Sequence, residues 1–267
     1  MSSPMFLILA LYVVAGSFMG LVAGVLGIGG GVFIVPILAS IFNHFAVTPP
    51  LITMQIAIGT SLAIMILTTQ AVVRAHVHIG QVLWEVVSRL LPGTLLGGVL
   101  GVLCTSFLKS DTLKIIFAVF VISIGLRMLF VRHPKLLTGL PRPWIFHSIT
   151  TTIGFFSGLL GIGGGSLMIP FLTKCNTPIR QAQAVSSLCS FALAVLASGV
   201  AVISGLNEPA PSWSLGYVYL PAFLLVAIPS MVTAPLGTRI AYLLPVLTLK
   251  RLFGGFLLFS GVHMMLS

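Results

Sequence analysis

Long apolar runs separated by short polar stretches follow one another along the whole chain. They cover residues 5–26, 31–42, 51–73, 83–107, 112–131, 144–160, 166–173, 182–206, 217–236 and 246–266. A helix needs about 20 apolar residues to cross a bilayer, and most of these runs approach that length. The pattern therefore predicts an all-α polytopic membrane protein whose long runs are membrane spans.

Two of the runs, 31–42 and 166–173, are too short to cross a bilayer. Each follows or overlaps a glycine cluster, Gly27-Ile28-Gly29-Gly30-Gly31 in the first case and Gly161-Ile162-Gly163-Gly164-Gly165 in the second. Glycine costs about 1 kcal/mol per residue in a helix relative to alanine, so such a cluster ends a helix. Irregular backbone at membrane depth is tolerated only where protein or a water-filled cavity covers it. We therefore predict that each short run belongs to a Gly-interrupted helix or a re-entrant half-helix.

The glycine clusters belong to an internal repeat. The first glycines of the two clusters, Gly27 and Gly161, are 134 residues apart in the sequence. The prolines that follow the clusters, Pro36 and Pro170, are also 134 residues apart. Self-similarity of this kind is the signature of repeated structural units. Residues 60–62 and 112–114 also match residues 186–188 and 248–250. The repeat predicts two homologous halves, namely a first membrane repeat over 1–131, a basic cytoplasmic linker over 132–143 and a second membrane repeat over 144–267.

Composition and charge narrow the class of protein further. The chain is 58% hydrophobic and only 6% charged, and its formal net charge is +10. On a soluble protein this charge would suggest a nucleic-acid partner. Here the basic residues cluster between apolar runs, as the positive-inside rule predicts for a membrane protein. We therefore expect a lipid bilayer around the chain and no nucleic acid.

The basic residues also predict how the two halves are oriented. If the basic linker is cytoplasmic, run 51–73 crosses the membrane inward and run 182–206 crosses it outward. The halves would then form an inverted repeat, provided that each short run returns to its own side as part of a hairpin. Lys109 and Lys114 fall on the outer side in this topology, against the rule. Eight plain spans with two parallel halves remain an alternative.

The glycine clusters are the first candidates for a substrate site. Each precedes a short helix, whose N-terminus offers unpaired N–H groups and the positive end of the helix dipole. Without side chains in the way, an anion can lie against these amides. Two such sites facing each other are usual in inverted-repeat transporters. The predicted lining is Gly29, Gly30, Gly31, Gly163, Gly164 and Gly165. The alternative is close helix packing, which suffices to explain Gly16, Gly20, Gly24 and Gly158.

Uncharged polar residues in or beside the spans, most of them at equivalent places of the repeat, are the second candidates. They can donate hydrogen bonds to an anion while the helices stay neutral. The alternative is that the hydroxyls bond the carbonyl of the preceding turn in their own helix. The predicted contacts are Gln55, Thr60, Ser61, Ser166, Gln181, Gln183, Ser186 and Ser187. Because Ser166 stands where the first half has Val32, the two halves of the site need not be equivalent.

The acidic residues are few, and their positions bear on energy coupling. Glu85, Asp111 and Glu208 are the only acids, and all lie at predicted span ends. A proton-coupled carrier usually keeps an ionisable residue within its spans. We therefore expect an anion exporter to use the membrane potential, which is worth about 2.3 kcal/mol per charge per 100 mV.

No sequence feature predicts a metal, a cofactor or a catalytic site. His76 and His78 fall in a segment that we predict to be a cytoplasmic turn, and no third metal ligand lies near them. The motifs of ATP binding, of serine hydrolases and of zinc proteases are absent from the sequence. We therefore expect no enzyme and no cofactor.

The doubled G-x-G-G-G-x-x-x-x-P motif resembles the TauE/SafE family of sulfite-exporter-like permeases. The resemblance extends over nearly the whole chain, from Gly27 to Pro36, from Gly161 to Pro170 and through the segments 60–62 and 186–188. It implies a multi-pass permease in the plasma membrane of a prokaryote. It also implies export of a small sulfur-containing anion such as sulfite, an organosulfonate or a related oxyanion. Convergent amides and hydroxyls suit the oxygens of such anions.

Two other classes of function stay open. One is an intramembrane enzyme or assembly factor that handles reduced sulfur, with Cys189 beside Ser186 and Ser187. The other is an anion channel. The sequence leaves open the substrate, the direction of transport, the coupling ion and whether the chain forms a homo-oligomer.

Overall fold

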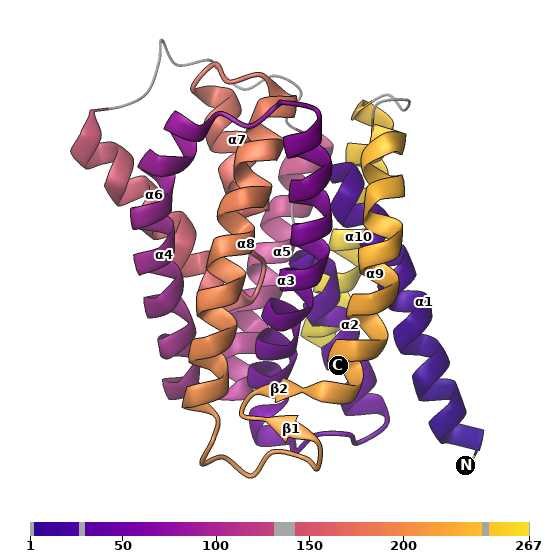
Figure 1. Cartoon of the computed structure of the whole chain (residues 1–267). Coiled ribbons are helices and arrows are strands. Elements are labelled where there is room, and N and C mark those ends of the chain that lie inside the picture. The colour runs from indigo at the N-terminus through magenta and orange to yellow at the C-terminus, as the bar shows by residue number, and fades with distance from the viewer. Residues whose placement is uncertain (1–2, 27–29, 131–141, 242–245, 267) are drawn as a thin grey trace.

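The computed structural model describes residues 3–26, 30–130, 142–241 and 246–266, and this part of the chain is almost entirely helical (Figure 1). Its helices are α1 Ser3–Leu26, α2 Gly31–His44, α3 Thr53–His78, α4 Trp84–Phe107, α5 Ser110–Phe130, α6 Pro143–Leu160, α7 Gly165–Lys174, α8 Ile179–Ser204, α9 Leu220–Ala241 and α10 Val246–Leu266. A 3₁₀ turn, Pro50–Ile52, precedes α3. Two short strands, β1 Ser214–Leu215 and β2 Val218–Tyr219, pair as an antiparallel hairpin between α8 and α9. The predicted all-α class is confirmed, and each helix lies within a few residues of an apolar run.

The helix α3 is longer than its apolar run, and this corrects one prediction. The segment from Arg74 to His78, expected to be a turn, continues α3, which ends just before Gly80. Gly80 has φ 71°, and a residue in this left-handed region ends a helix. Within the last turns of α3, His76 is buried and His78 is exposed. The two histidines therefore lie on different faces of the helix.

The long helices have the surface of a membrane protein. By length and composition, five helices of the described chain can cross a membrane, namely α1, α3, α4, α8 and α9. Large apolar side chains such as Val14 and Leu96 are exposed on them, as contact with lipid tails requires. All three tryptophans are also exposed, with Trp84 and Trp144 at the starts of α4 and α6 and Trp213 beside the β-hairpin. Tryptophan favours the interface between membrane and water. The chain is thus a multi-pass membrane protein.

Small residues bring two pairs of helices into close contact. In the pair α1–α9, a Cβ at Gly20 would lie 2.6 Å from the Cα of Ser230. In the pair α4–α6, a Cβ at Gly97 would lie 2.7 Å from the backbone nitrogen of Phe155. Such approaches are impossible for any larger residue, and they are the usual use of small residues between membrane helices. Close packing is likewise confirmed for Gly16, Gly24 and Gly158.

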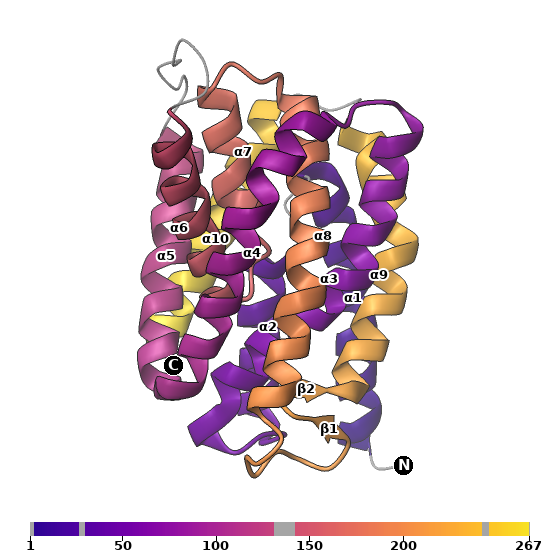
Figure 2. The same cartoon turned by 60° about the vertical axis from the view of Figure 1, so that its left-hand side comes forward.

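The helices of the two halves pair in matching ways. The contact of α1 with α9 corresponds to that of α6 with α4, and the contacts of α3 with α9 and of α2 with α3 correspond to those of α8 with α4 and of α7 with α8. The remaining large contacts join equivalent helices, α3 with α8 and α5 with α10. Figures 1 and 2 show α3 and α8 running in opposite directions. In agreement, Gly59 near the start of α3 and Gly205 after the end of α8 both pack against Tyr217. A pseudo-two-fold relation predicts this pattern, and the inverted repeat itself remains a prediction.

The short helices α2 and α7 begin inside the bundle rather than at its ends (Figure 1). A Cβ at Gly30, just before α2, would lie 3.2 Å from the Cβ of Ala23 in α1. The neighbouring Gly20 of α1 packs against Ser230, which is in the middle of α9. A Cβ at Gly164, just before α7, would lie 3.1 Å from the Oγ of Ser157 in α6. Both N-termini are therefore near mid-depth.

Charged residues are distributed unevenly between the two ends of the bundle. We call the end that holds the β-hairpin the lower end and the opposite one the upper end (Figure 1). The arginines of the described residues all lie at or near helix ends on the upper side, namely Arg74, Arg89, Arg127, Arg142, Arg180, Arg239 and Arg251. The lower end has Lys109 and Lys114 at the start of α5. By the positive-inside rule the upper end would be cytoplasmic.

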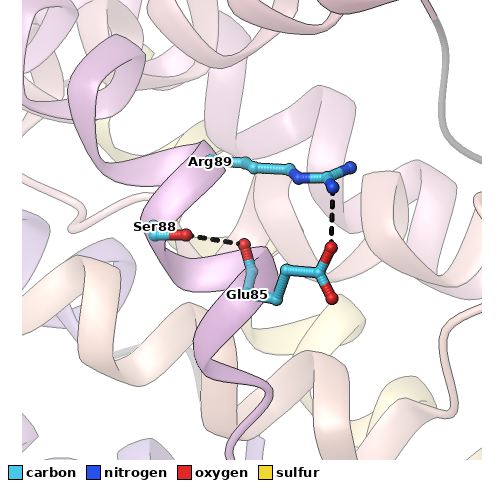
Figure 3. A network of polar contacts seen from close by, with 3 residues as sticks. All are labelled: Glu85, Ser88 and Arg89. Atoms are coloured by element: carbon cyan, nitrogen blue, oxygen red, sulfur yellow. Dashed lines mark hydrogen bonds and ion pairs between the residues drawn. The ribbon is translucent and has the colours of Figure 1, made fainter.

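The three acids lie outside the helix interiors, as predicted. In the first turn of α4, the Oε1 of Glu85 is 2.6 Å from the Nη2 of Arg89, and Ser88 donates a hydrogen bond to the Glu85 carbonyl (Figure 3). Both charged side chains of this pair are more than half exposed, so the pair contributes only about 0.5 kcal/mol. Asp111 is in the first turn of α5, and Glu208 follows α8. No carboxylate is therefore available within the helical core.

Candidate functional site

The two glycine breaks meet in the middle of the bundle. A Cβ at Gly31, the first residue of α2, would lie 2.7 Å from the Cα of Ile162 and would also collide with the carbonyl oxygen of Gly161. Gly161 itself packs against Ile58 of α3, because its Cβ would lie 3.0 Å from the Ile58 oxygen. The N-terminus of α2 thus abuts the second break directly. Gly29, the other predicted residue of the first break, lies outside the described residues.

Both short helices begin on a glycine in the left-handed region. Gly30 has φ 78° before α2, and Gly164 has φ 79° before α7. Neither helix has a side-chain cap. In the described chain, the first helical bonds of α7 run from the amides of Leu167 and Met168 to the Gly164 carbonyl, so the N–H groups of residues 163–166 donate no hydrogen bond. Such unpaired amides at the positive end of a helix dipole can bind an anion.

Two carbonyl groups of the second break accept hydrogen bonds from serine side chains, whereas the amides of residues 163–166 donate none in the described chain. Ser61 of α3 donates a hydrogen bond of 2.9 Å to the Gly161 carbonyl. Ser190 of α8 donates one to the Gly163 carbonyl. These hydroxyls offset the dipoles of the Gly161 and Gly163 carbonyls, while the amides of residues 163–166 have no partner in the described chain. The electrostatic balance at this point consequently favours a negatively charged ligand over a cation.

Two hydroxyls predicted for the site are buried and unpaired. Ser166, the second residue of α7, has a buried Oγ without a hydrogen-bond partner in the described chain. The same holds for Ser186 of α8, a residue that is fully buried. Helix α7, with Gly165 and Ser166 at its start, packs against α8. A buried hydroxyl without a partner costs about 1–3 kcal/mol, and a bound anion would remove this cost.

The other predicted polar residues are only partly near the breaks. The Thr60 hydroxyl accepts a hydrogen bond of 3.0 Å from the Tyr219 amide, and Ser187 donates one to the Ala184 carbonyl in its own helix. Gln183 of α8 donates to Val25, at the end of α1. The Thr60 and Gln183 bonds connect α3 and α8 with neighbouring segments, whereas the Ser187 bond lies within α8.

The structure does not bring Gln55 and Gln181 to the breaks. Gln55 is in the first turn of α3, where its Nε2 donates a hydrogen bond of 2.8 Å to the Leu108 carbonyl. Its buried Oε1 has no partner in the described chain. Gln181 is half-buried in the first turn of α8. Since α3 and α8 run in opposite directions, these two residues lie toward opposite ends of the bundle.

Met65 of α3 occupies the space between the two breaks, and no feature of the sequence had pointed to this residue. Its Sδ would lie 2.8 Å from a Cβ at Gly31 and 3.1 Å from a Cβ at Gly163. Its side chain is fully buried. Gly30, Gly31 and residues 161–165 are buried as well. The breaks are therefore closed in this conformation, with a flexible thioether side chain between them.

The cysteines bear on the alternative of thiol chemistry. All three are free, with Cys175 and Cys189 buried and Cys104 half-buried. Burial raises the pKa of the Cys175 thiol, which follows α7. A raised pKa lowers the fraction of reactive thiolate. The arrangement gives no support to a reactive cysteine beside Ser186 and Ser187.

Comparison with known proteins points to a transporter family. Residues 12–264 match the family model described as "Sulfite exporter TauE/SafE". A protein of Haemophilus influenzae described as a "probable membrane transporter protein" is 33% identical over 265 residues, which cover 98% of this chain and 100% of the relative. A protein of Methanocaldococcus jannaschii with a similar description is 29% identical over 266 residues, or 97% of this chain and 96% of the relative. No solved structure matches the chain. The family and these relatives are described as transporters, not as enzymes.

Proposed function

The chain belongs to the TauE/SafE family of sulfite exporters, and from this premise we propose that it is a secondary transporter that exports a small sulfur-containing anion. Sulfite and organosulfonates are the substrates that we favour within this class. The transporter would work in the plasma membrane of a prokaryote, which agrees with the bacterial and archaeal origin of its relatives.

The observation that carries the proposal is the N-terminus of α7. Within the described residues, four consecutive amides, those of residues 163–166, donate no hydrogen bond, and the buried Oγ of Ser166 beside them has no partner. The nearby carbonyls of Gly161 and Gly163 are already bonded by serine hydroxyls. An oxyanion with several oxygens can accept hydrogen bonds from these amides and from the Ser166 hydroxyl.

The opposed halves of the chain support alternating access to this site. The break before α2 meets the break before α7, and the helices around them pair in matching ways. Inverted-repeat transporters bind substrate at such a junction and open to either side by moving one part against the other. In the described conformation Met65 fills the junction, so binding would require its side chain to move.

The test is to remove the Ser166 hydroxyl. We expect Ser166→Ala to raise the KM for methanesulfonate or sulfite efflux from proteoliposomes about tenfold, because a hydrogen bond to a charged ligand is worth about 1.5–3 kcal/mol. We expect the unfolding temperature to stay the same or rise, because the hydroxyl has no partner to lose. A residue that only supports the fold would give the opposite pattern, with lower stability and unchanged KM.

Ser148→Ala is the matched control. Ser148 is exposed on α6, and its hydroxyl donates a hydrogen bond only within its own helix, to the Trp144 carbonyl. This variant should keep both the KM and the unfolding temperature. If Ser166→Ala behaves like Ser148→Ala in both measurements, the α7 N-terminus is not the anion site.

A further inference from the structure

A cavity with several polar side chains in its lining lies at the lower end of the bundle, away from the glycine breaks. It has a volume of about 650 Å³. We call it the lower pocket. Its lining residues come from the end of α2, the starts of α3 and α5 and the end of α10, and they include Ser40, Asn43, Thr53, Ser110, Lys114 and His263. Neither the family description nor the relatives' names assign a role to this cavity.

We propose that the lower pocket is a second, hydrated anion-binding site on the substrate's path, with Lys114 as its charged group. This proposal rests on the proposed function, because it places the pocket at the exit of an anion transporter. It concerns the same class of ligand, a small sulfonate or sulfur oxyanion, bound more weakly than at the breaks.

The first argument is the state of Lys114. Its side chain is half-buried, and in the described chain it forms no ion pair and no hydrogen bond. Asp111, the other charged residue of the lining, is exposed in the first turn of α5, where the helix dipole stabilises a carboxylate without help from a lysine. A cation at a cavity wall without a carboxylate partner attracts anions from solution.

The second argument is the presence of unused donors beside Lys114. Ser110 is 7% exposed, and its Oγ accepts a hydrogen bond of 3.1 Å from the Met54 amide, so its proton is free to donate. Ser40 lines the same wall and forms no side-chain hydrogen bond in the described chain. His44 and His263, both exposed, also line the pocket and offer ring N–H donors. Together with a lysine, these groups fit the oxygens of an anion.

The third argument is that one helix connects the lower pocket with the glycine breaks. The N-terminus of α2 is at the junction of the breaks, and its last turns, with Ser40 and Asn43, line the pocket. The 14 residues of α2 span about 21 Å. The lower pocket is thus where an anion released from the breaks along α2 would arrive. This position also explains why a lysine lies at the end that otherwise lacks basic residues apart from Lys109.

The test measures the electrostatic potential and the occupancy of the pocket without measuring transport. Ser40→Cys is labelled with an anionic and with a cationic methanethiosulfonate reagent, and the ratio of the two rates reports the local potential. We expect Lys114→Gln to lower the anionic-to-cationic ratio about five- to tenfold, as removal of a unit charge a few ångströms away predicts. The matched change Lys109→Gln, at an exposed lysine outside the lining, should change the ratio less than twofold. Asn43→Cys serves as a second probe position if Ser40→Cys does not fold.

Occupancy is tested with methanesulfonate, which does not react with thiols. Millimolar methanesulfonate should slow labelling of Ser40→Cys severalfold, and Lys114→Gln should abolish this protection. Equal effects of Lys114→Gln and Lys109→Gln, or no protection by methanesulfonate, would overturn the proposal. Since labelling needs no transport, such a result would leave the Ser166→Ala experiment unaffected. A failure of Ser166→Ala would likewise leave the occupancy of the lower pocket measurable.

Discussion

At the scale of single residues, Met65 fills the space between the two breaks in the closed conformation. A methionine is unbranched and flexible, so it can fill the space between Gly31 and Gly163 and also leave it. We predict that Met65→Ala increases the efflux of a bulky sulfonate relative to methanesulfonate at least threefold. Met65→Leu, which keeps the volume, should retain the ratio of the parent protein. Efflux of the two sulfonates from proteoliposomes is the measurement.

A stability control separates this steric role from general loosening. Met65→Ala removes a fully buried side chain and should cost about 2–5 kcal/mol of unfolding free energy. Leu90→Ala, at a fully buried position of α4 near the upper end, should cost a similar amount. If Leu90→Ala changes the sulfonate ratio as much as Met65→Ala does, the effect does not arise at the breaks.

At the scale of the helices, the break between α6 and α7 depends on glycine at position 163. Gly163 has φ 69°, and its Cβ would collide with the terminal methyl group of Met65. We predict that Gly163→Ala lowers the unfolding temperature and inactivates efflux, because strain of about 1–2 kcal/mol adds to the collision. Gly199→Ala, in the interior of α8 with nothing within 4 Å of its Cβ, should raise the unfolding temperature, since alanine favours a helix by up to about 1 kcal/mol. Thermal unfolding in detergent is the measurement, and we expect it to show a lower unfolding temperature for Gly163→Ala and a higher one for Gly199→Ala. A decrease in both variants would contradict the prediction.

The helices were largely predictable from the sequence because Gly and Pro mark their ends and apolar runs fill their interiors. The hairpin of β1 and β2 was missed, since two-residue strands leave no periodic pattern. The end of α3 was also missed, because Gly80 and not the hydropathy sets it. Ser61 and Ser186 were identified from the repeat and Ser166 from its place directly after the second glycine cluster, and the structure places Ser61 and Ser166 at the second break.

Equivalent positions in the repeat did not indicate proximity to the site for residues far from mid-depth. If the two-fold axis lies in the membrane plane, equivalent residues approach each other only near that axis. Gln55 and Gln181 are in the first turns of α3 and α8, which run in opposite directions, so the two residues lie toward opposite ends of the bundle. Met65 could not be found at all, because a methionine in an apolar helix has the same pattern whether it faces lipid, the core or a substrate.

At the scale of the whole molecule, the distribution of charge predicts how transport is driven. The acids lie outside the helix interiors, and the described arginines lie at or near one end of the bundle. An anion that leaves through a neutral site carries its own charge across the membrane potential, which is worth about 2.3 kcal/mol per charge per 100 mV. We therefore predict that a valinomycin-set potential of 100 mV changes the accumulation ratio of methanesulfonate by about 50-fold. A pH gradient without a potential should have no effect.

His76 allows a test of the alternative, proton-coupled mechanism, because it is a buried histidine that could carry the proton. It is buried near the end of α3, and neither ring nitrogen has a partner in the described chain. If transport uses the potential alone, His76→Gln should leave the dependence on valinomycin unchanged, and the divalent sulfoacetate should respond about twice as strongly as methanesulfonate on a logarithmic scale. Accumulation that follows the pH gradient and is lost in His76→Gln would instead assign the coupling to a proton on this histidine.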